Sequence, residues 1–156
     1  MSVISISCSG ESSQAINKAI DEAYHQGVIT VVPAGDKNRD AKQMSPSASL
    51  HAITVGATDR NKIRTSWSNW GSRVNIFAPG VRICSAWKGN DNKAIKSASG
   101  SAAAAAHVAG IVVHLKSFNH LRTAETTWNF MQSISPRGVV KNEKRGSNMF
   151  AYNFSG

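Results

Sequence analysis

Long apolar runs are missing from this sequence. No stretch approaches the roughly 20 consecutive apolar residues that a membrane-spanning helix needs. The first residues have neither the basic start nor the apolar stretch of a secretory signal. These absences lead us to expect a soluble, cytoplasmic protein without a membrane partner.

Cysteine is also scarce, because Cys8 and Cys84 are the whole complement. Reduced thiols suit the expected location better than a disulfide, since bridges persist in oxidising compartments. A buried cysteine behaves as a small apolar residue. We therefore assign neither cysteine a redox role.

Acidic residues are few, with 9 Asp and Glu against 18 Lys and Arg, and the formal net charge is +9. Such an excess favours contact with nucleic acid, anionic lipid or an acidic partner. The basic residues are scattered, however, with a mild cluster at Lys141, Lys144 and Arg145. No nucleic-acid-binding motif accompanies them. A solvated basic surface is expected instead, without nucleic acid as a partner.

The first part of the chain reads as a βαβ unit. Val3 to Cys8 has strand composition, and Ser12 or Ser13 can cap a helix that continues to Ala23. Val28 to Val32 follows as a continuous β-branched run, which is typical of a strand buried on both faces of a parallel sheet.

Two further strands are predicted at Ala52 to Gly56 and Val74 to Phe77, which brings the sheet to about four strands. Helices are predicted from Ala102 to Leu115, where small residues allow close packing, and from Thr123 to Ser133. The expected fold is α/β, with a short, mostly parallel sheet flanked by helices in one domain over residues 1–156.

Several segments match, in order, the subtilisin-like serine protease (subtilase) family, and especially its proteinase-K-like fungal branch. They are Val31-Val32-Pro33-Ala34-Gly35-Asp36, Ser45-Pro46-Ser47-Ala48, Ala52 to Asp59, Ser66 to Gly71, Ile76 to Gly80, Gly100 to Gly110 and Asn148 to Asn153. Nearly the whole chain resembles the carboxy-terminal half of that family, which implies a truncated subtilisin-like fold.

The same resemblance implies that the protease chemistry is absent. The family's catalytic Asp and His precede the segment that starts here at Val3. Its Gly-Thr-Ser at the nucleophile is Gly100-Ser101-Ala102 in this chain, and a methyl group cannot attack a carbonyl. Asp36 replaces the Asn whose amide stabilises the oxyanion, a loss worth on the order of 10²–10³ in rate.

No substitute for the lost nucleophile is expected beside Ala102. Ser99 and Ser101 flank the nucleophile position, but nucleophilic catalysis needs an oriented base within hydrogen-bond reach. His107, the nearest histidine in sequence, matches a structural histidine of the family.

The family's calcium-binding Asp is Asn75 here, which lacks the charge that calcium affinity depends on, so no metal and no cofactor are expected.

Two classes of function remain open. The first is a pseudoprotease that binds a peptide, protein or small molecule in the inherited cleft, whose residues by resemblance are Ser7, Cys8, Ser9, Gly10, Gly35, Asp36, Ser101 and Ala102. The second is a repurposed isomerase, lyase or cyclase that uses Asp36 as general acid or base on a small metabolite. Asp36 should lie at the carboxyl end of a parallel strand, beside the start of the helix at Ala102, where open α/β sheets bind ligands.

The resemblance also predicts a partner. The strand from Val3 lies inside the sheet in the family, beside a strand of the half that is missing here. In this chain it becomes an edge, and exposed edges are templates for pairing. We expect a second copy of the chain to cover this edge or the face beside it; the alternative is that an N-terminal extension of the chain covers it.

Overall fold

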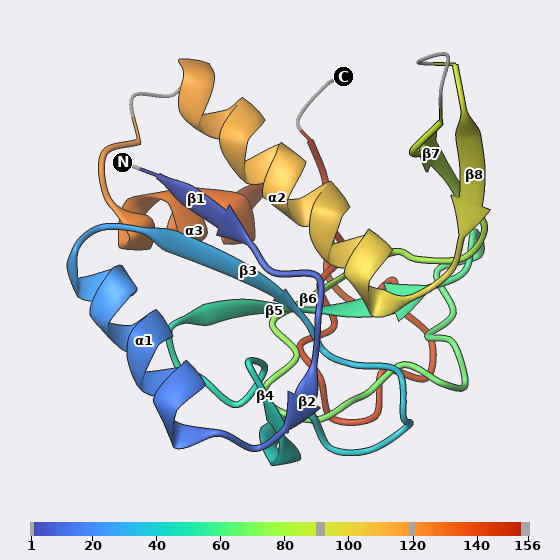
Figure 1. Cartoon of the computed structure of the whole chain (residues 1–156), viewed down its shortest axis with the longest axis horizontal. Helices are drawn as coiled ribbons and strands as arrows, with labels where there is room; N and C mark the ends of the chain where they lie inside the picture. The colour runs from blue at the N-terminus through green and yellow to red at the C-terminus, as the bar shows by residue number, and fades with distance from the viewer. Residues whose placement is uncertain (1, 90–92, 119–120, 154–156) are drawn as a thin grey trace.

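Four parallel strands form the centre of the fold, in the order β1-β3-β5-β6 (Figure 1). The computed structural model describes residues 2–89, 93–118 and 121–153. The strands are β1 (Val3–Ser5), β2 (Gly10–Glu11), β3 (Ile29–Pro33), β4 (Met44–Ser45), β5 (Ala52–Thr58), β6 (Ile76–Pro79), β7 (Ile83–Ala86) and β8 (Ile95–Ala98). The helices are α1 (Gln14–His25), the short 3₁₀ helix η1 (Ala41–Gln43), α2 (Ser101–Phe118) and α3 (Ala124–Ile134).

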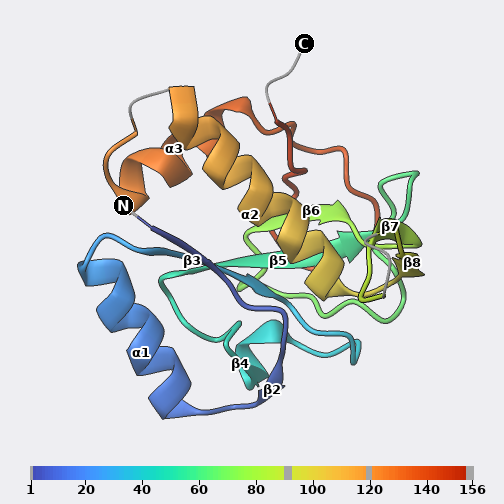
Figure 2. The same ribbon diagram turned by 45° about the horizontal axis from the view of Figure 1, so that its top comes forward.

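Helices cover both faces of this sheet, which confirms the predicted α/β class. Figures 1 and 2 place α1 on one face and α2 on the other, with α3 next to α2. Successive side chains of a strand point to opposite faces. Val31 accordingly belongs to the core under α2 and α3, and Val32 packs with Ile20 of α1.

Composition explains why these segments take these positions. Every residue of β3 and β5 is buried, as expected of strands covered on both faces. Helix α2 crosses the sheet closely because the residues that it presents to the core include Ala104, Ala105 and Ala109. Among the residues that the structure describes, no helix has the length and apolar character to cross a membrane.

Both amphipathic helices begin where hydroxyl caps are available. The Ser13 Oγ accepts the N–H of Ile16 at the start of α1. At α3, the Thr123 side chain accepts the N–H of Thr126, and the Thr126 hydroxyl accepts the N–H of Thr123. This reciprocal capping box satisfies two amides that a helix start leaves open.

The structure corrects three details. Strand β1 ends at Ser5 and not at Cys8, because the chain turns away after Ile6, whose N–H still donates to the Val31 carbonyl (3.0 Å). The antiparallel pairs β2–β4 and β7–β8 were not predicted. Cys8 and Cys84 are free and exposed and do not contribute buried apolar volume.

Candidate functional site

The carboxyl end of β3 and the amino-terminal end of α2 are joined by two hydrogen bonds. The Gly35 N–H donates to the Ser101 Oγ (3.1 Å), and the Ser101 N–H donates to the Asp36 Oδ1 (2.9 Å). Strand β3 thus delivers Gly35 and Asp36 to the first turn of α2, as predicted. Gly35, Asp36, Ser101 and Ala102 come together at this junction.

Asp36 is exposed and does not lie at the base of an enclosed pocket. One of its oxygens satisfies a backbone amide that the start of a helix leaves unpaired. Its negative charge also lies at the positive end of the helix dipole. This environment is that of a capping acid that is open to solvent, and not that of a dry, enclosed site in which acid–base catalysis is efficient.

The two serines beside Ala102 are already engaged in structural hydrogen bonds. Ser101 is 1% exposed, and its Oγ accepts the Gly35 N–H. The Ser99 Oγ accepts the N–H of Arg82 (2.9 Å). Within the described ranges, neither hydroxyl has a histidine or carboxylate partner in a hydrogen bond.

His107 lies along α2 from these serines but does not reach them. Its Nδ1 lies 3.1 Å from the Pro79 carbonyl oxygen. A carbonyl can only accept, so Nδ1 is the donor and the ring is oriented by the end of β6. The contact fits the structural role that the resemblance implies for this histidine.

The exposed segment Ser7–Gly10 reaches the same junction through Ser9. A methyl group added at Gly35 would lie 3.4 Å from the Ser9 Oγ, so the two residues are near neighbours. The backbone of Ser7, Cys8 and Ser9 makes no hydrogen bond to the backbone of another described residue, whereas Gly10 pairs with Ser45. Free N–H and C=O groups therefore border the Asp36 junction.

Asn69, whose positioning role was not predicted, holds the loop after β3 in place. Its side chain is fully buried and donates from Nδ2 to the Ala34 carbonyl (2.8 Å). Its Oδ1 accepts the N–H groups of Lys37 and Arg39, each at 3.0 Å. The three bonds fix the backbone on both sides of Asp36. The Ser66–Gly71 motif contains Asn69, but its role depends on a contact between distant segments, which sequence spacing alone does not reveal.

Asn75, which by resemblance stands at the position of the family's calcium-binding aspartate, is engaged in a hydrogen bond. Its Oδ1 accepts the Thr54 N–H (2.7 Å), so this oxygen is engaged within the sheet. No group of three His, Cys, Asp or Glu residues suited to a metal ion occurs in the part of the chain that the structure describes.

Sequence and structure comparisons relate this chain to known proteins. The sequence model of the subtilase family (Peptidase S8) matches residues 1–151. Alkaline protease 1 of Aspergillus flavus is 39% identical over 150 residues, and a subtilisin-like protease of Coccidioides posadasii is 41% identical over 152 residues. A cold-adapted subtilisin-like serine proteinase of known structure superimposes with a TM-score of 0.90 at 34% identity.

These matches cover this chain almost completely but their own chains only in part. The alignment takes in 96% of this chain and 37% of the Aspergillus protease, and 97% and 37% for the Coccidioides protease. For the solved proteinase the shares are 99% and 55%. The chain therefore spans well under two thirds of the length of each of these relatives.

The expected cytoplasmic location is wrong. The homologues are secreted fungal subtilisin-like proteases, which are extracellular. The expectation came from the first residues, which lack a leader pattern. Since the chain corresponds to little more than a third of these relatives, its first residues carry no information about a leader.

Proposed function

The chain belongs to the subtilase family, and from that premise we propose that it is a proteolytically inactive member that binds an extended peptide along Ser7–Gly10. The observation that carries this proposal is Ala102, in the first turn of α2 where the family has its nucleophilic serine. The hydroxyls beside it are held by Gly35 and Arg82 and are not paired with a base.

Peptide binding is supported by the unpaired backbone of residues 7–9. An extended peptide gains affinity by adding main-chain hydrogen bonds to exposed backbone groups, in the manner of an added strand. Ser7, Cys8 and Ser9 are all exposed, and Gly35, which directly precedes Asp36, lies beside Ser9, so a peptide with a basic side chain near this end can gain a charge contact with Asp36.

The alternative, a repurposed enzyme with Asp36 as general acid or base, has weaker support. The carboxylate is exposed, and one oxygen accepts the Ser101 N–H. A group of this kind lacks the dry, shaped surroundings in which acid–base catalysis is efficient.

The exposed thiols allow a direct test of peptide binding. Cys8 lies within the proposed binding segment, whereas Cys84 lies on β7. The rate of alkylation of each thiol by a maleimide is measured in Cys84→Ser and Cys8→Ser variants, with and without a capped Ala-Ala-Pro-Phe peptide. Peptide should slow modification of Cys8 severalfold and leave Cys84 unchanged. Equal rates at Cys8 with and without saturating peptide would refute binding at this segment.

The loss of hydrolysis is tested by restoring the hydroxyl. Ala102→Ser should leave cleavage of a peptide p-nitroanilide at the background rate, because a serine without an oriented base is a weak nucleophile. Ala103→Ser is the matched control, with the hydroxyl one position along the helix. Turnover above that control, in either the original chain or Ala102→Ser, contradicts the proposal.

We further propose that a second copy of the chain covers the outer edge of β1. This strand pairs with β3 in the described sheet, and its other edge carries backbone groups that no described residue pairs. Ile4 on β1 is 42% exposed, and Val113 on α2, which packs over β1, is 55% exposed. Two such edges related by a two-fold axis can pair in antiparallel orientation.

A further inference from the structure

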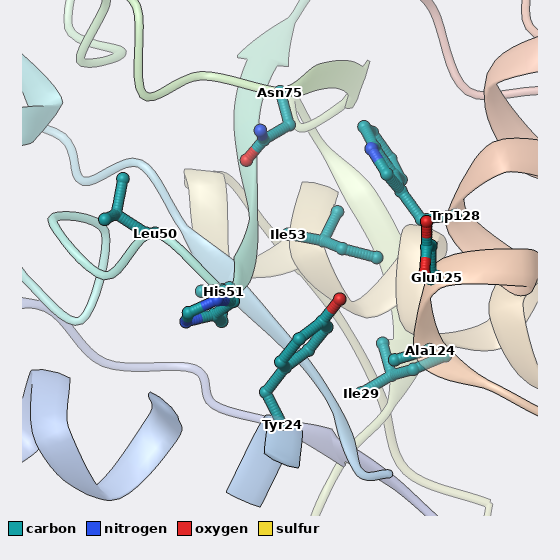
Figure 3. Close-up of a pocket in the computed structure, with 10 residues that line it drawn as sticks. Tyr24, Ile29, Leu50, His51, Ile53, Asn75, Ala124, Glu125 and Trp128 are labelled. Carbon is teal, nitrogen blue, oxygen red and sulfur yellow. The ribbon is translucent and has the colours of Figure 1, made fainter. Parts of the chain in front are cut away.

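A hollow of about 120 Å³ lies at the opposite end of the sheet from Asp36. It opens at the amino-terminal ends of β3, β5 and β6, between α1 and α3 (Figure 3). Ile29 is the first residue of β3, Ala52 is the first of β5, and Asn75 precedes β6 directly. The hollow is therefore separate from the junction of β3 with α2.

The charge around this hollow contrasts with the charge of the whole protein. The chain has 18 Lys and Arg and a net charge of +9, yet neither residue type lines the hollow. The ionisable acid that lines it is Glu125, in the first turn of α3. Glu125 thus places a negative charge at the hollow of a basic molecule, and such a charge attracts cations.

Glu125 is exposed to solvent at the start of α3. The capping box of Thr123 and Thr126 fixes the first turn of α3, from which the carboxylate projects beside Trp128 (Figure 3). No Lys, Arg or His among the described residues lies within 4.0 Å of the Glu125 carboxylate. The site therefore offers a carboxylate whose charge is not neutralised by an ion pair within the described chain.

Aromatic rings supply the facing wall. Tyr24 stacks on His51 with ring centroids 4.4 Å apart and planes inclined by 22°. His51 is itself fixed by Asp21, since its Nδ1 lies 3.0 Å from Oδ1. Figure 3 shows the Tyr24 side chain reaching across the hollow toward α3, where Trp128 lies. Aromatic faces attract organic cations through the ring quadrupole.

The remaining wall is apolar. Ile29, Leu50, Ile53 and Ala124 contribute aliphatic surface, and Leu50 is 67% exposed at the rim. An apolar wall selects against a strongly hydrated inorganic ion and in favour of a cation with a hydrocarbon stem. The volume suits one small group and excludes a folded domain.

We propose that this hollow binds a small organic cation, an alkylammonium or guanidinium group on a short aliphatic stem. The cationic head pairs with Glu125 and lies against the rings of Tyr24 and Trp128, while the stem contacts Leu50 and Ile53. A free alkylamine and the side chain of a lysine or arginine in a peptide share this chemistry. The site is independent of the peptide segment proposed above, and neither proposal depends on the other.

The probe is n-butylammonium, with n-butanol as a neutral analogue of the same shape. Binding to residues 1–156 is followed by the NMR shift of the Trp128 indole N–H, which is assigned with Trp128→Phe. Saturable shifts are expected with butylammonium, and butanol should bind several times more weakly. Nα-acetyl-lysine methylamide, whose side-chain ammonium group is free, reports whether a lysine side chain of a peptide is accepted as well as the free amine.

Glu125→Gln should weaken butylammonium binding roughly fivefold, as expected for loss of one partly solvated charge contact. Glu143→Gln, a matched change outside the hollow, should leave it unchanged. Raising the sodium chloride concentration with the original chain gives a second measure that does not depend on the variant folding, and affinity should fall. Equal binding of amine and alcohol, or affinity that is insensitive to both Glu125→Gln and salt, would overturn the proposal.

Discussion

Asp21 lies in a small hydrogen-bonded cluster between α1 and the loop before β5. Burial raises the pKa of Asp21, but hydrogen bonds from His51 and Ser49 and the nearby charges of His51 and His25 outweigh it, so the pKa falls below its ordinary value of 3.8. The Ser49 hydroxyl donates to Oδ1 at 2.9 Å. In its ionised form, the Asp21 carboxylate therefore holds His51 in place at the rim of the hollow.

This pKa shift predicts how stability depends on pH. A carboxyl whose folded pKa lies below its unfolded value stabilises the fold above the unfolded pKa, and the contribution is lost as pH falls through the folded pKa. Asp21→Asn should lower the free energy of unfolding by about 1 kcal/mol at neutral pH, with the ionic part reduced because the side chain is partly exposed. Urea denaturation at descending pH measures it.

The difference between the original chain and Asp21→Asn should shrink below pH 3.8 and nearly vanish once Asp21 is protonated in the folded state. Glu22→Gln, which removes an exposed i,i+4 pair with Lys18, serves as the control and should change stability by a few tenths of a kcal/mol. A gap between the two chains that is constant with pH would contradict the assigned cause.

For Asp36, the sequence predicts the position but not the exposure. The position of Asp36 beside α2 could be predicted from the family resemblance, together with the rule that ligand sites of open α/β sheets lie at the carboxyl ends of the strands. Its exposure could not, since that depends on which segments cover the junction. The cluster of Asp21, Tyr24 and His51 was missed because α1 and the loop before β5 are far apart in sequence and meet only in the fold.

Strand β5 contains a glycine that its neighbours require. A methyl group added at Gly56 would overlap the Phe77 ring of β6 and approach the Val74 side chain. Phe77 is fully buried, so its ring has little room to move. Close packing of β5 against this ring thus depends on the absence of a side chain.

Gly56→Ala should therefore destabilise the chain by about 1–3 kcal/mol through overpacking. Gly110→Ala is the opposite case, because a methyl group there meets nothing within 4 Å, and glycine in a helix such as α2 costs up to about 1 kcal/mol relative to alanine. Thermal unfolding followed by circular dichroism should give melting temperatures that move in opposite directions. A tolerated Gly56→Ala would show that the β6 side of the sheet is softer than its packing indicates.

At the level of elements, the sequence predicted the helices and the central strands well and the small antiparallel pairs not at all. The buried runs of β3 and β5 and the caps of α1 and α3 are local signals of several residues. Strands β2 and β4 are two residues each and pair across a long separation, so they leave no periodic pattern. The β7–β8 pair is almost wholly exposed and lacks the alternating apolar pattern of a half-buried hairpin.

The proposed pairing with a second copy predicts that the whole molecule is a dimer in solution. Sedimentation equilibrium at micromolar concentration should give a mass twice the 16.7 kDa of one chain. Ile4→Lys should shift the chain toward the monomer, because a charge on an edge strand opposes pairing. Ile16→Lys is a close control, since Ile16 on α1 is 45% exposed and Ile4 is 42% exposed. A monomer for the original chain would reject the proposal, as would equal effects of the two changes.

The central sheet has one further property, because its spatial order β1-β3-β5-β6 repeats the order of synthesis. Each strand that leaves the ribosome finds its partner already made, and domains can fold vectorially as the nascent chain lengthens. Growth proceeds at the β6 side, while the outer edge of β1 is never consumed by a later strand of the described sheet. The strands made after β1 therefore leave that edge unpaired, and the second copy proposed above can pair with it before β6 has been made.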